Sequence, residues 1–288
     1  MSLRLEGAPV ASQISANLKK RVKDLAKQGV YPKIAMINVG QRKDNVAYCN
    51  AAQRRFQTLD ILYECVQLPE TVKQSELVER IGDLNHNPAV HGILVFRPLP
   101  DTICEEAVCD AIVPEKDVDG VDLTSMAGVY SGRDLGFAPC TADAVLRLLK
   151  FYRIGIDGKK ITVIGRSPVI GRPVASLLLR EHATVTVCHS HTEDLKGACQ
   201  QADIVIAAAG RAEFLKREYF RSEQTVIDIG INYSEEKKKI VGDVDFEDVE
   251  TLVTAITPVP AGVGSITTSV LADHVVTAAE QMQRSGTC

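Results

Sequence analysis

Residues 160–173 read KITVIGRSPVIGRP, and this stretch decides the fold. Its first five residues form an apolar β-branched run without alternation, which is typical of a strand buried on both faces of a parallel sheet. Gly165 follows the run, and residues 171–179 have the apolar spacing of a helix. A strand, a glycine-containing turn and a helix N-terminus together form the usual cradle for the pyrophosphate of a dinucleotide.

This turn supplies most of the candidate cofactor-binding residues. They are Gly165, Arg166, Ser167, Ile170 and Gly171, joined by His189, Ser190 and Ile231 from the ends of later strands. The spacing departs from G-x-G-x-x-G, because Ser167 stands where the second glycine would be. A tight strand-to-helix turn without a ligand is therefore an alternative interpretation.

The segment after the next strand favours NADP over NAD. Sheets that bind NAD usually carry an Asp or Glu about 20 residues beyond the first glycine. Here residues 188–191 read Cys-His-Ser-His, so no carboxylate would repel a 2′-phosphate, whereas Arg166 and Ser190 can bind one. Ordinary exposed polar residues are the alternative. The two His residues have no third ligand nearby, so we predict no metal.

Alternating strands and helices extend outward from this segment through the whole chain. We predict further strands at 33–39, 62–67, 91–96, 184–187, 202–207, 225–229 and 252–256, and further helices at 12–28, 46–59, 75–84, 142–152 and 269–281. Such alternation predicts an α/β fold with parallel sheets. The charged run at residues 234–239 is predicted to be a solvated loop.

We expect two domains. Residues 1–141, completed by 269–288, would form an N-terminal α/β sandwich that binds the substrate, with the C-terminal helix returning to it. Residues 142–268 would form a Rossmann-type, doubly wound NAD(P)-binding domain. The length of 288 residues is consistent with two domains.

Composition narrows the class of protein. The net charge of -4 argues against a nucleic-acid or anionic-membrane surface. The longest apolar run, residues 204–209, is far shorter than the roughly 20 residues that span a bilayer. The eight Cys residues contain no C-x-x-C pair, so we interpret them as reduced thiols. We therefore expect a soluble, cytoplasmic protein.

Several short motifs occur in one order along the chain. They are Pro98-Leu99-Pro100, PEKDVDG at 114–120, Pro139-Cys140-Thr141, the Gly165-Arg166-Ser167 turn, Cys188-His189-Ser190 and TPVPAGVG at 257–264. From about Leu5 to Ala279 the chain resembles the bifunctional methylenetetrahydrofolate dehydrogenase/methenyltetrahydrofolate cyclohydrolase family. The resemblance implies a homodimer, NAD(P) on the second domain and a folate between the two domains.

The resemblance also implies substrate-site residues. Tyr48 and Asp119 correspond to the family's catalytic, pterin-binding Tyr and Asp, and a phenol ring can stack on a pterin while a carboxylate accepts N–H bonds from it. Without the resemblance they would be interpreted as a half-buried helix residue and a turn residue. The remaining predicted substrate-binding residues are Phe96, Arg97, Pro98, Leu99, Gly262 and Gly264.

The chain departs from the family pattern at the proton-handling pair. The family's Y-x-x-x-K motif would place a Lys at position 52, which is Ala52, and the Gln of V-Q-L-P-L-P is Phe96. Ala142, Ala261, Ser265 and Ile266 also differ from the pattern. For Arg97 we consider pairing with Asp119 or another carboxylate, binding of a glutamate tail, and exposure to solvent.

These observations predict an NADP-dependent oxidation of 5,10-methylenetetrahydrofolate to 5,10-methenyltetrahydrofolate, with weak or absent cyclohydrolase activity. Hydride transfer needs no protein base, whereas hydrolysis must remove a proton from water. One alternative is a bifunctional enzyme with a relocated base. The others are a non-catalytic folate- or nucleotide-binding homologue and a Rossmann dehydrogenase for an unrelated metabolite.

Overall fold

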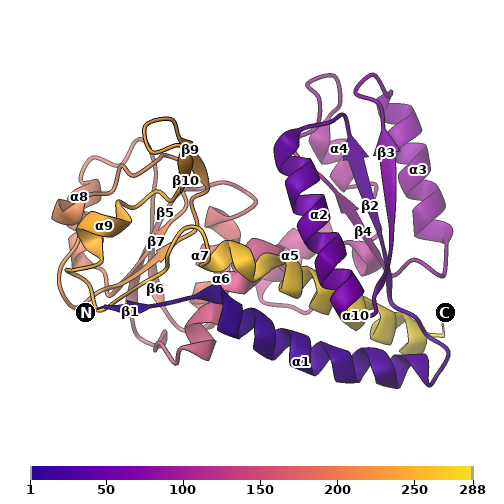
Figure 1. Ribbon diagram of the computed structural model, residues 1–288, viewed down its shortest axis with the longest axis horizontal. Helices are drawn as coiled ribbons and strands as arrows, with labels where there is room; N and C mark the ends of the chain where they lie inside the picture. The colour runs from indigo at the N-terminus through magenta and orange to yellow at the C-terminus, as the bar shows by residue number, and fades with distance from the viewer. Residues whose placement is uncertain (1, 287–288) are drawn as a thin grey trace. The chain divides into compact units, whose positions relative to one another are not determined.

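The computed structural model describes residues 2–286, apart from the side chains of residues 43 and 44 (Figure 1). The chain divides into two compact units. The six-stranded unit comprises Met1–Ser12 and Thr141–Thr267, and the three-stranded unit comprises Gln13–Cys140 and Thr268–Cys288. The predicted α/β class is confirmed, since every pair of strands within each main sheet is parallel.

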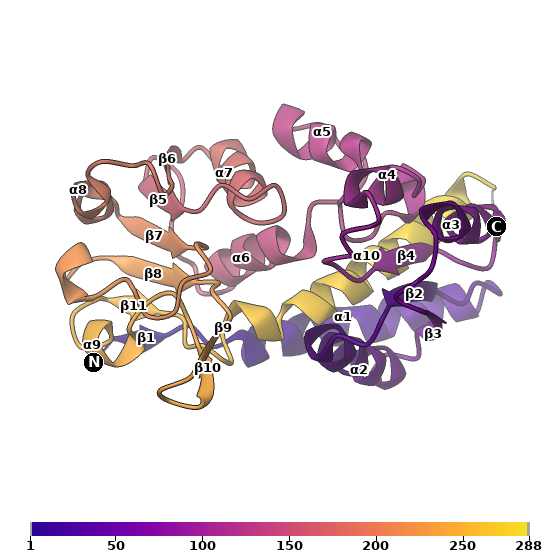
Figure 2. The same cartoon turned by 90° about the horizontal axis from the view of Figure 1, so that it is seen from above.

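The three-stranded unit has the strand order β3-β2-β4. Its strands are β2 (Lys33–Val39), β3 (Leu62–Leu68) and β4 (Gly92–Val95). Helices α2 (Lys43–Thr58) and α3 (Gln74–His86) cover opposite faces of this sheet (Figures 1 and 2). The shorter elements of this unit are α4 (Glu105–Cys109), η1 (Pro114–Lys116) and α5 (Leu123–Ser131).

The C-terminal helix α10 (Thr267–Arg284) packs in the three-stranded unit, as predicted. Helix α1 (Gly7–Ala26) carries Arg21, whose guanidinium binds Asp273, Thr277 and Glu280 on α10. The side chain of His274 on α10 is buried against the loop that carries Asp119, where its Nδ1 lies 2.8 Å from the Val118 carbonyl oxygen. Residues from distant parts of the sequence therefore build one core.

The six-stranded unit has the strand order β1-β11-β8-β7-β5-β6. Its strands are β1 (Leu3–Arg4), β5 (Lys160–Ile164), β6 (Thr184–Cys188), β7 (Ile204–Ala207), β8 (Thr225–Asp228) and β11 (Ala255–Ile256). The helices are α6 (Cys140–Phe151), α7 (Gly171–Arg180), α8 (Leu195–Gln201) and α9 (Phe246–Val249), with short turns η2 (Arg217–Tyr219) and η3 (Val263–Ser265).

The strand order of this sheet fixes where a ligand can bind. The chain runs from β5 outward to β6 and then returns to β7 on the other side of β5. In doubly wound sheets such a switch point leaves a crevice at the carboxyl ends of the strands. Gly165 follows β5 at this point. The Gly165–Gly171 turn therefore lies where a dinucleotide would be expected.

Two parts of the six-stranded unit differ from the prediction. Residues 1–12, which we placed in the other domain, belong here because Leu3 and Arg4 pair with Ala255 and Ile256. The charged run at residues 234–239 is the turn of a small hairpin rather than a loop alone, since β9 (Asn232–Ser234) pairs with β10 (Lys239–Val241).

Within residues 2–286, no helix is long and apolar enough to cross a membrane.

Candidate active site

The turn after β5 is built so that backbone segments approach closely. Gly165 has φ +125°, and its amide donates to the Cys188 carbonyl over 2.8 Å. A Cβ at Gly165 would lie 2.1 Å from the Ala208 carbonyl oxygen, and one at Gly171 would lie 2.2 Å from the Gly165 carbonyl oxygen. Both positions therefore require glycine. Ser167, between them, accepts a hydrogen bond on Oγ from the Ile170 amide at 3.1 Å.

Polar side chains from the next strand lie beside this turn. The parallel register pairs Ile164 with Cys188, so His189 and Ser190 follow β6 where Gly165 and Arg166 follow β5. Arg166, Ser167 and Ser190 are exposed. His189 Nδ1 accepts the His191 amide at 3.1 Å, so this ring nitrogen is used within its own turn. The structure thus brings together the residues predicted to bind the pyrophosphate and those predicted to bind the 2′-phosphate.

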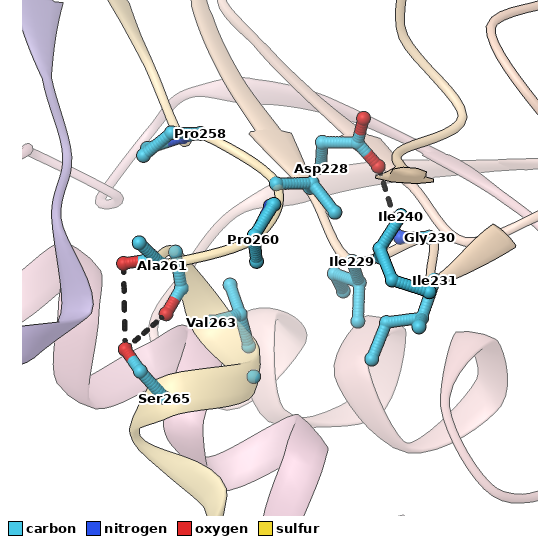
Figure 3. A pocket seen from close by; sticks show the side chains of 13 residues that line it. Asp228, Ile229, Gly230, Ile231, Ile240, Pro258, Pro260, Ala261, Val263 and Ser265 are labelled. Carbon is cyan, nitrogen blue, oxygen red and sulfur yellow. Dashed lines mark hydrogen bonds between the residues drawn. The ribbon is translucent and has the colours of Figure 1, made fainter. Parts of the chain in front are cut away.

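A cavity of about 320 Å³ lies at the ends of β8 and β11 (Figure 3). It is lined by the predicted residues Ile231, Gly262 and Gly264, together with Asp228 and Ser265. Ile231 is 68% exposed. We predicted that Gly262 and Gly264 contact the folate, and the structure places both in the six-stranded unit, in the same cavity as Ile231.

Asp228 holds the segments that line this cavity. Its Oδ1 accepts from the amides of Gly230 at 2.9 Å and Asp243 at 3.0 Å, and its Oδ2 accepts from the Val244 amide at 2.8 Å. Burial raises the pKa of the Asp228 carboxyl to about 7. We did not predict this residue, because a single Asp at the end of an apolar strand carries no spacing signal.

Tyr48 and Phe96 lie together in the three-stranded unit. Their ring centroids are 5.9 Å apart and the rings meet edge to face at 76°. Ala52 lies one helical turn beyond Tyr48 on α2 and is fully buried, and Phe96 is 5% exposed. Buried apolar side chains thus occupy the two positions where the family pattern has Lys and Gln.

Arg97 is paired with carboxylates rather than facing solvent. Its Nη2 lies 3.3 Å from Asp119 Oδ2 and its Nη1 lies 3.6 Å from Glu105 Oε1. Glu105 Oε2 also accepts the Leu99 amide at 3.3 Å. The Arg97 side chain is only 17% exposed, so the solvent-facing alternative is wrong. Of its neighbours, Pro98 is exposed and Leu99 is buried.

The loop that presents Asp119 is held from several sides. Asp117 is fully buried, and its Oδ2 accepts the Val121 amide at 2.7 Å and the Asp122 amide at 3.0 Å. Burial, helped by a hydrogen bond to Asp122, raises the pKa of the Asp117 carboxyl to about 8. The Val118 carbonyl accepts from His274 Nδ1. These contacts position Asp119. The sequence motif predicts Asp119 as a site residue but does not predict that Asp117 and His274 hold its loop.

A parallel sheet with a glycine turn at its switch point, joined to a second parallel α/β unit, defines a two-unit NAD(P)-binding protein. Residues 139–283 match the tetrahydrofolate dehydrogenase/cyclohydrolase NAD(P)-binding domain, and residues 5–119 match the catalytic domain of the same family. The chain belongs to the tetrahydrofolate dehydrogenase/cyclohydrolase family. The predicted family and its assignment as an NAD(P)-dependent dehydrogenase are confirmed.

Curated relatives match over nearly the whole chain. The bifunctional protein FolD of Carboxydothermus hydrogenoformans is 44% identical over 281 residues, covering 97% of this chain and 98% of the relative. FolD of Clostridioides difficile is 46% identical over 274 residues, covering 95% of each.

Solved structures of the family show the same fold. The bifunctional FolD dehydrogenase/cyclohydrolase of Campylobacter jejuni has a TM-score of 0.95 and 38% identity, covering 98% of this chain and 99% of that one. The Trypanosoma brucei methylenetetrahydrofolate dehydrogenase-cyclohydrolase, solved with NADP and an inhibitor, has a TM-score of 0.93 and 33% identity, covering 98% and 99%.

Proposed function

We propose that this chain oxidises 5,10-methylenetetrahydrofolate to 5,10-methenyltetrahydrofolate with NADP and hydrolyses the methenyl product slowly or not at all. The burial of Ala52 and Phe96 beside Tyr48 carries this proposal. Neither side chain can accept a proton from water. Loss of a general base typically lowers a rate by about 10²- to 10⁴-fold, so the effect should fall on hydrolysis.

The dehydrogenase step makes smaller demands on the protein. Bound NADP supplies the hydride acceptor, and positioning by the protein does most of the rest. Tyr48 would stack on the pterin, and Asp119 would accept N–H bonds from its amide edge. Arg97, 3.3 Å from Asp119, would hold that carboxylate in a fixed orientation. Tyr48 and Asp119, the two groups that would contact the pterin, are both present in this chain.

The cofactor residues also favour NADP. The Gly165–Gly171 turn would hold the pyrophosphate, while Arg166 and Ser190 would bind the 2′-phosphate. The cavity lined by Ile231, Gly262 and Gly264 would receive the nicotinamide, and its volume of about 320 Å³ is at the lower end of the range for ligand pockets.

A fully bifunctional enzyme with a relocated base is the second candidate, because the relatives at 44% and 46% identity are named bifunctional. The candidates for a relocated base that we consider in the three-stranded unit are Lys116, Tyr63 and His91. Lys116 Nζ donates to three backbone carbonyls, and Tyr63 Oη accepts from Gln57 at 2.7 Å. Burial lowers the pKa of His91 to about 4. These contacts support the monofunctional proposal over the bifunctional one.

We also propose a homodimer formed through the six-stranded unit. Strand β6 is at the end of the sheet order, and its free side is a row of backbone donors and acceptors. Thr184, Thr186 and Val187 on this strand are exposed. A second copy of β6 can satisfy that edge. A cytoplasmic location, expected from the sequence, stays a prediction.

The test is a turnover assay with both folates. Purified protein is given methylenetetrahydrofolate and NADP or NAD, and NADPH or NADH formation is followed together with methenyl- and formyltetrahydrofolate. We expect reduction of NADP with accumulation of the methenyl product. Rapid conversion of added methenyltetrahydrofolate to the formyl form would favour the bifunctional candidate. Cofactor binding without turnover would instead favour a non-catalytic homologue.

A further inference from the structure

Two cysteine sulfurs lie in contact in the three-stranded unit although their positions are 16 residues apart. Cys49 Sγ on α2 is 3.8 Å from Cys65 Sγ on β3. The Gln53 amide, one helical turn beyond Cys49, donates to Cys65 Sγ at 2.9 Å and to Cys49 Sγ at 3.4 Å. Side-chain rotation over a short distance would bring the sulfurs to the bonded separation of about 2.05 Å.

The two thiols differ in access. Cys65 is exposed and can be reached by a soluble reagent, whereas Cys49 is partly buried. Burial, together with the neighbouring Cys65, raises the pKa of Cys49 to about 11. Cys49 therefore stays protonated and reacts slowly with a reagent in solution. Held against Cys65, it would react intramolecularly at a high effective concentration.

We propose that Cys49 and Cys65 form a reversible disulfide, installed by a low-molecular-weight disulfide such as oxidised glutathione. The Cys65 thiolate attacks one glutathione sulfur, the glutathione disulfide bond breaks, and one glutathione leaves as a thiolate that takes up a proton. Cys49 then loses its proton, attacks the Cys65 sulfur and releases the second glutathione. Two protein thiols are oxidised, and one glutathione disulfide is reduced to two thiols.

The bond would join the helix that carries Tyr48 to the edge strand of its sheet. Cys49 directly follows Tyr48, and β3 is at one end of the strand order β3-β2-β4. Closing the loop from residue 49 to 65 restricts the unfolded chain, so the oxidised protein should have the higher Tm. This inference concerns the sulfur chemistry alone and does not rest on the proposed reaction.

Peptide mapping of the full-length protein after incubation with oxidised glutathione tests the proposal. We expect a linked peptide containing Cys49 and Cys65, which a dithiol reductant reverses, and a Tm raised by several degrees. In C49S the glutathione adduct on Cys65 should persist, because nothing displaces it. In C65S, Cys49 should stay unmodified. The control is C104S, which removes another exposed thiol and should still form the link between Cys49 and Cys65.

A stable glutathione adduct on Cys65 of the unsubstituted protein, a different cysteine pair or no oxidised product would overturn the proposal. These readouts are independent of turnover. An inactive protein that forms the link would sink the proposed function and leave the disulfide standing, and an active protein without the link would do the reverse.

Discussion

At the scale of single residues, the proposed loss of hydrolysis depends on Ala52 and Phe96, which lie beside Tyr48. The family pattern has a Lys and a Gln at positions 52 and 96, and in this chain both positions carry buried apolar side chains. A smaller residue on α2 and a larger one after β4 keep the local volume similar, which packed interiors tolerate best. The family motifs locate Tyr48, Ala52 and Phe96 from the sequence alone, because each motif is defined by the spacing of its residues.

Restoring the pair should restore hydrolysis. We expect A52K combined with F96Q to raise the rate of methenyltetrahydrofolate hydrolysis by about 10²-fold or more, since a positioned acid–base group is worth this much. The measurement is the decay of the methenyl absorbance. A52M with F96Q is the matched control, because it has length without a base. Equal rates in the two double variants would contradict the role given to Ala52.

The buried Asp117 should make stability depend on pH. Its folded-state pKa of about 8 exceeds the ordinary 3.8, so the folded protein keeps a proton that the unfolded chain releases. The stabilisation that protonated Asp117 gives the folded protein is fully present below about pH 4 and is lost as the pH rises through about 8. Asp228, with its pKa raised to about 7, acts in the same direction.

We therefore expect Asp117→Asn to weaken the fall in unfolding free energy between pH 5 and pH 9, leaving the part due to Asp228. Urea unfolding across this range measures it, with D110N as the control because Asp110 is exposed. An unchanged slope in D117N would show that the carboxyl does not carry the effect. The sequence could not predict the role of Asp117, since tertiary packing decides that Asp117 is fully buried and Asp119 only partly buried.

At the scale of elements, long apolar-periodic segments are predictable and short ones are not. The strands at 33–39 and 160–164 match the predicted bounds. By contrast β1 has two residues and β9 three, too few to show any period. Helix α1 begins at Gly7 rather than at residue 12, and buried Val10 extends its apolar repeat toward the N-terminus.

The contact between α1 and α10 can be tested through Arg21. R21M removes the hydrogen bonds to Asp273, Thr277 and Glu280 while keeping most of the side-chain volume, so we expect a loss of about 2 kcal/mol in unfolding free energy. R21K should lose less, because it keeps the charge. Urea unfolding is the measurement, with K19M on the exposed face of α1 as control. Equal stability of R21M and the unsubstituted protein would show that these bonds contribute nothing net.

At the scale of the whole molecule, the order of the two units and the return of the last helix follow from the sequence pattern. The sequence pattern does not predict that residues 1–12 belong to the six-stranded unit, because this depends on a pairing of only two residues between β1 and β11. The edge position of β6 is likewise a property of the assembled sheet. No local pattern in TVTVC distinguishes an outer strand from an inner one.

The free edge leads to a prediction about assembly. We expect light scattering to give twice the chain mass of 31.3 kDa for the unsubstituted protein. V187K should shift it toward the monomer, because a charge on the exposed edge opposes strand pairing. Tyr233→Lys, at another exposed apolar position, should leave the mass unchanged. A monomeric unsubstituted protein, or a V187K variant that stays dimeric, would contradict pairing through β6.

The chain passes between the two units three times, at residues 12–13, 140–141 and 267–268. During synthesis on a ribosome, a domain made of one continuous segment can fold as soon as that segment emerges. Here β1 must wait for Ala255 and Ile256, and the three-stranded unit must wait for α10. Neither unit should therefore complete its folding before β11 and α10 have been synthesised, and apolar sheet faces should stay exposed until then.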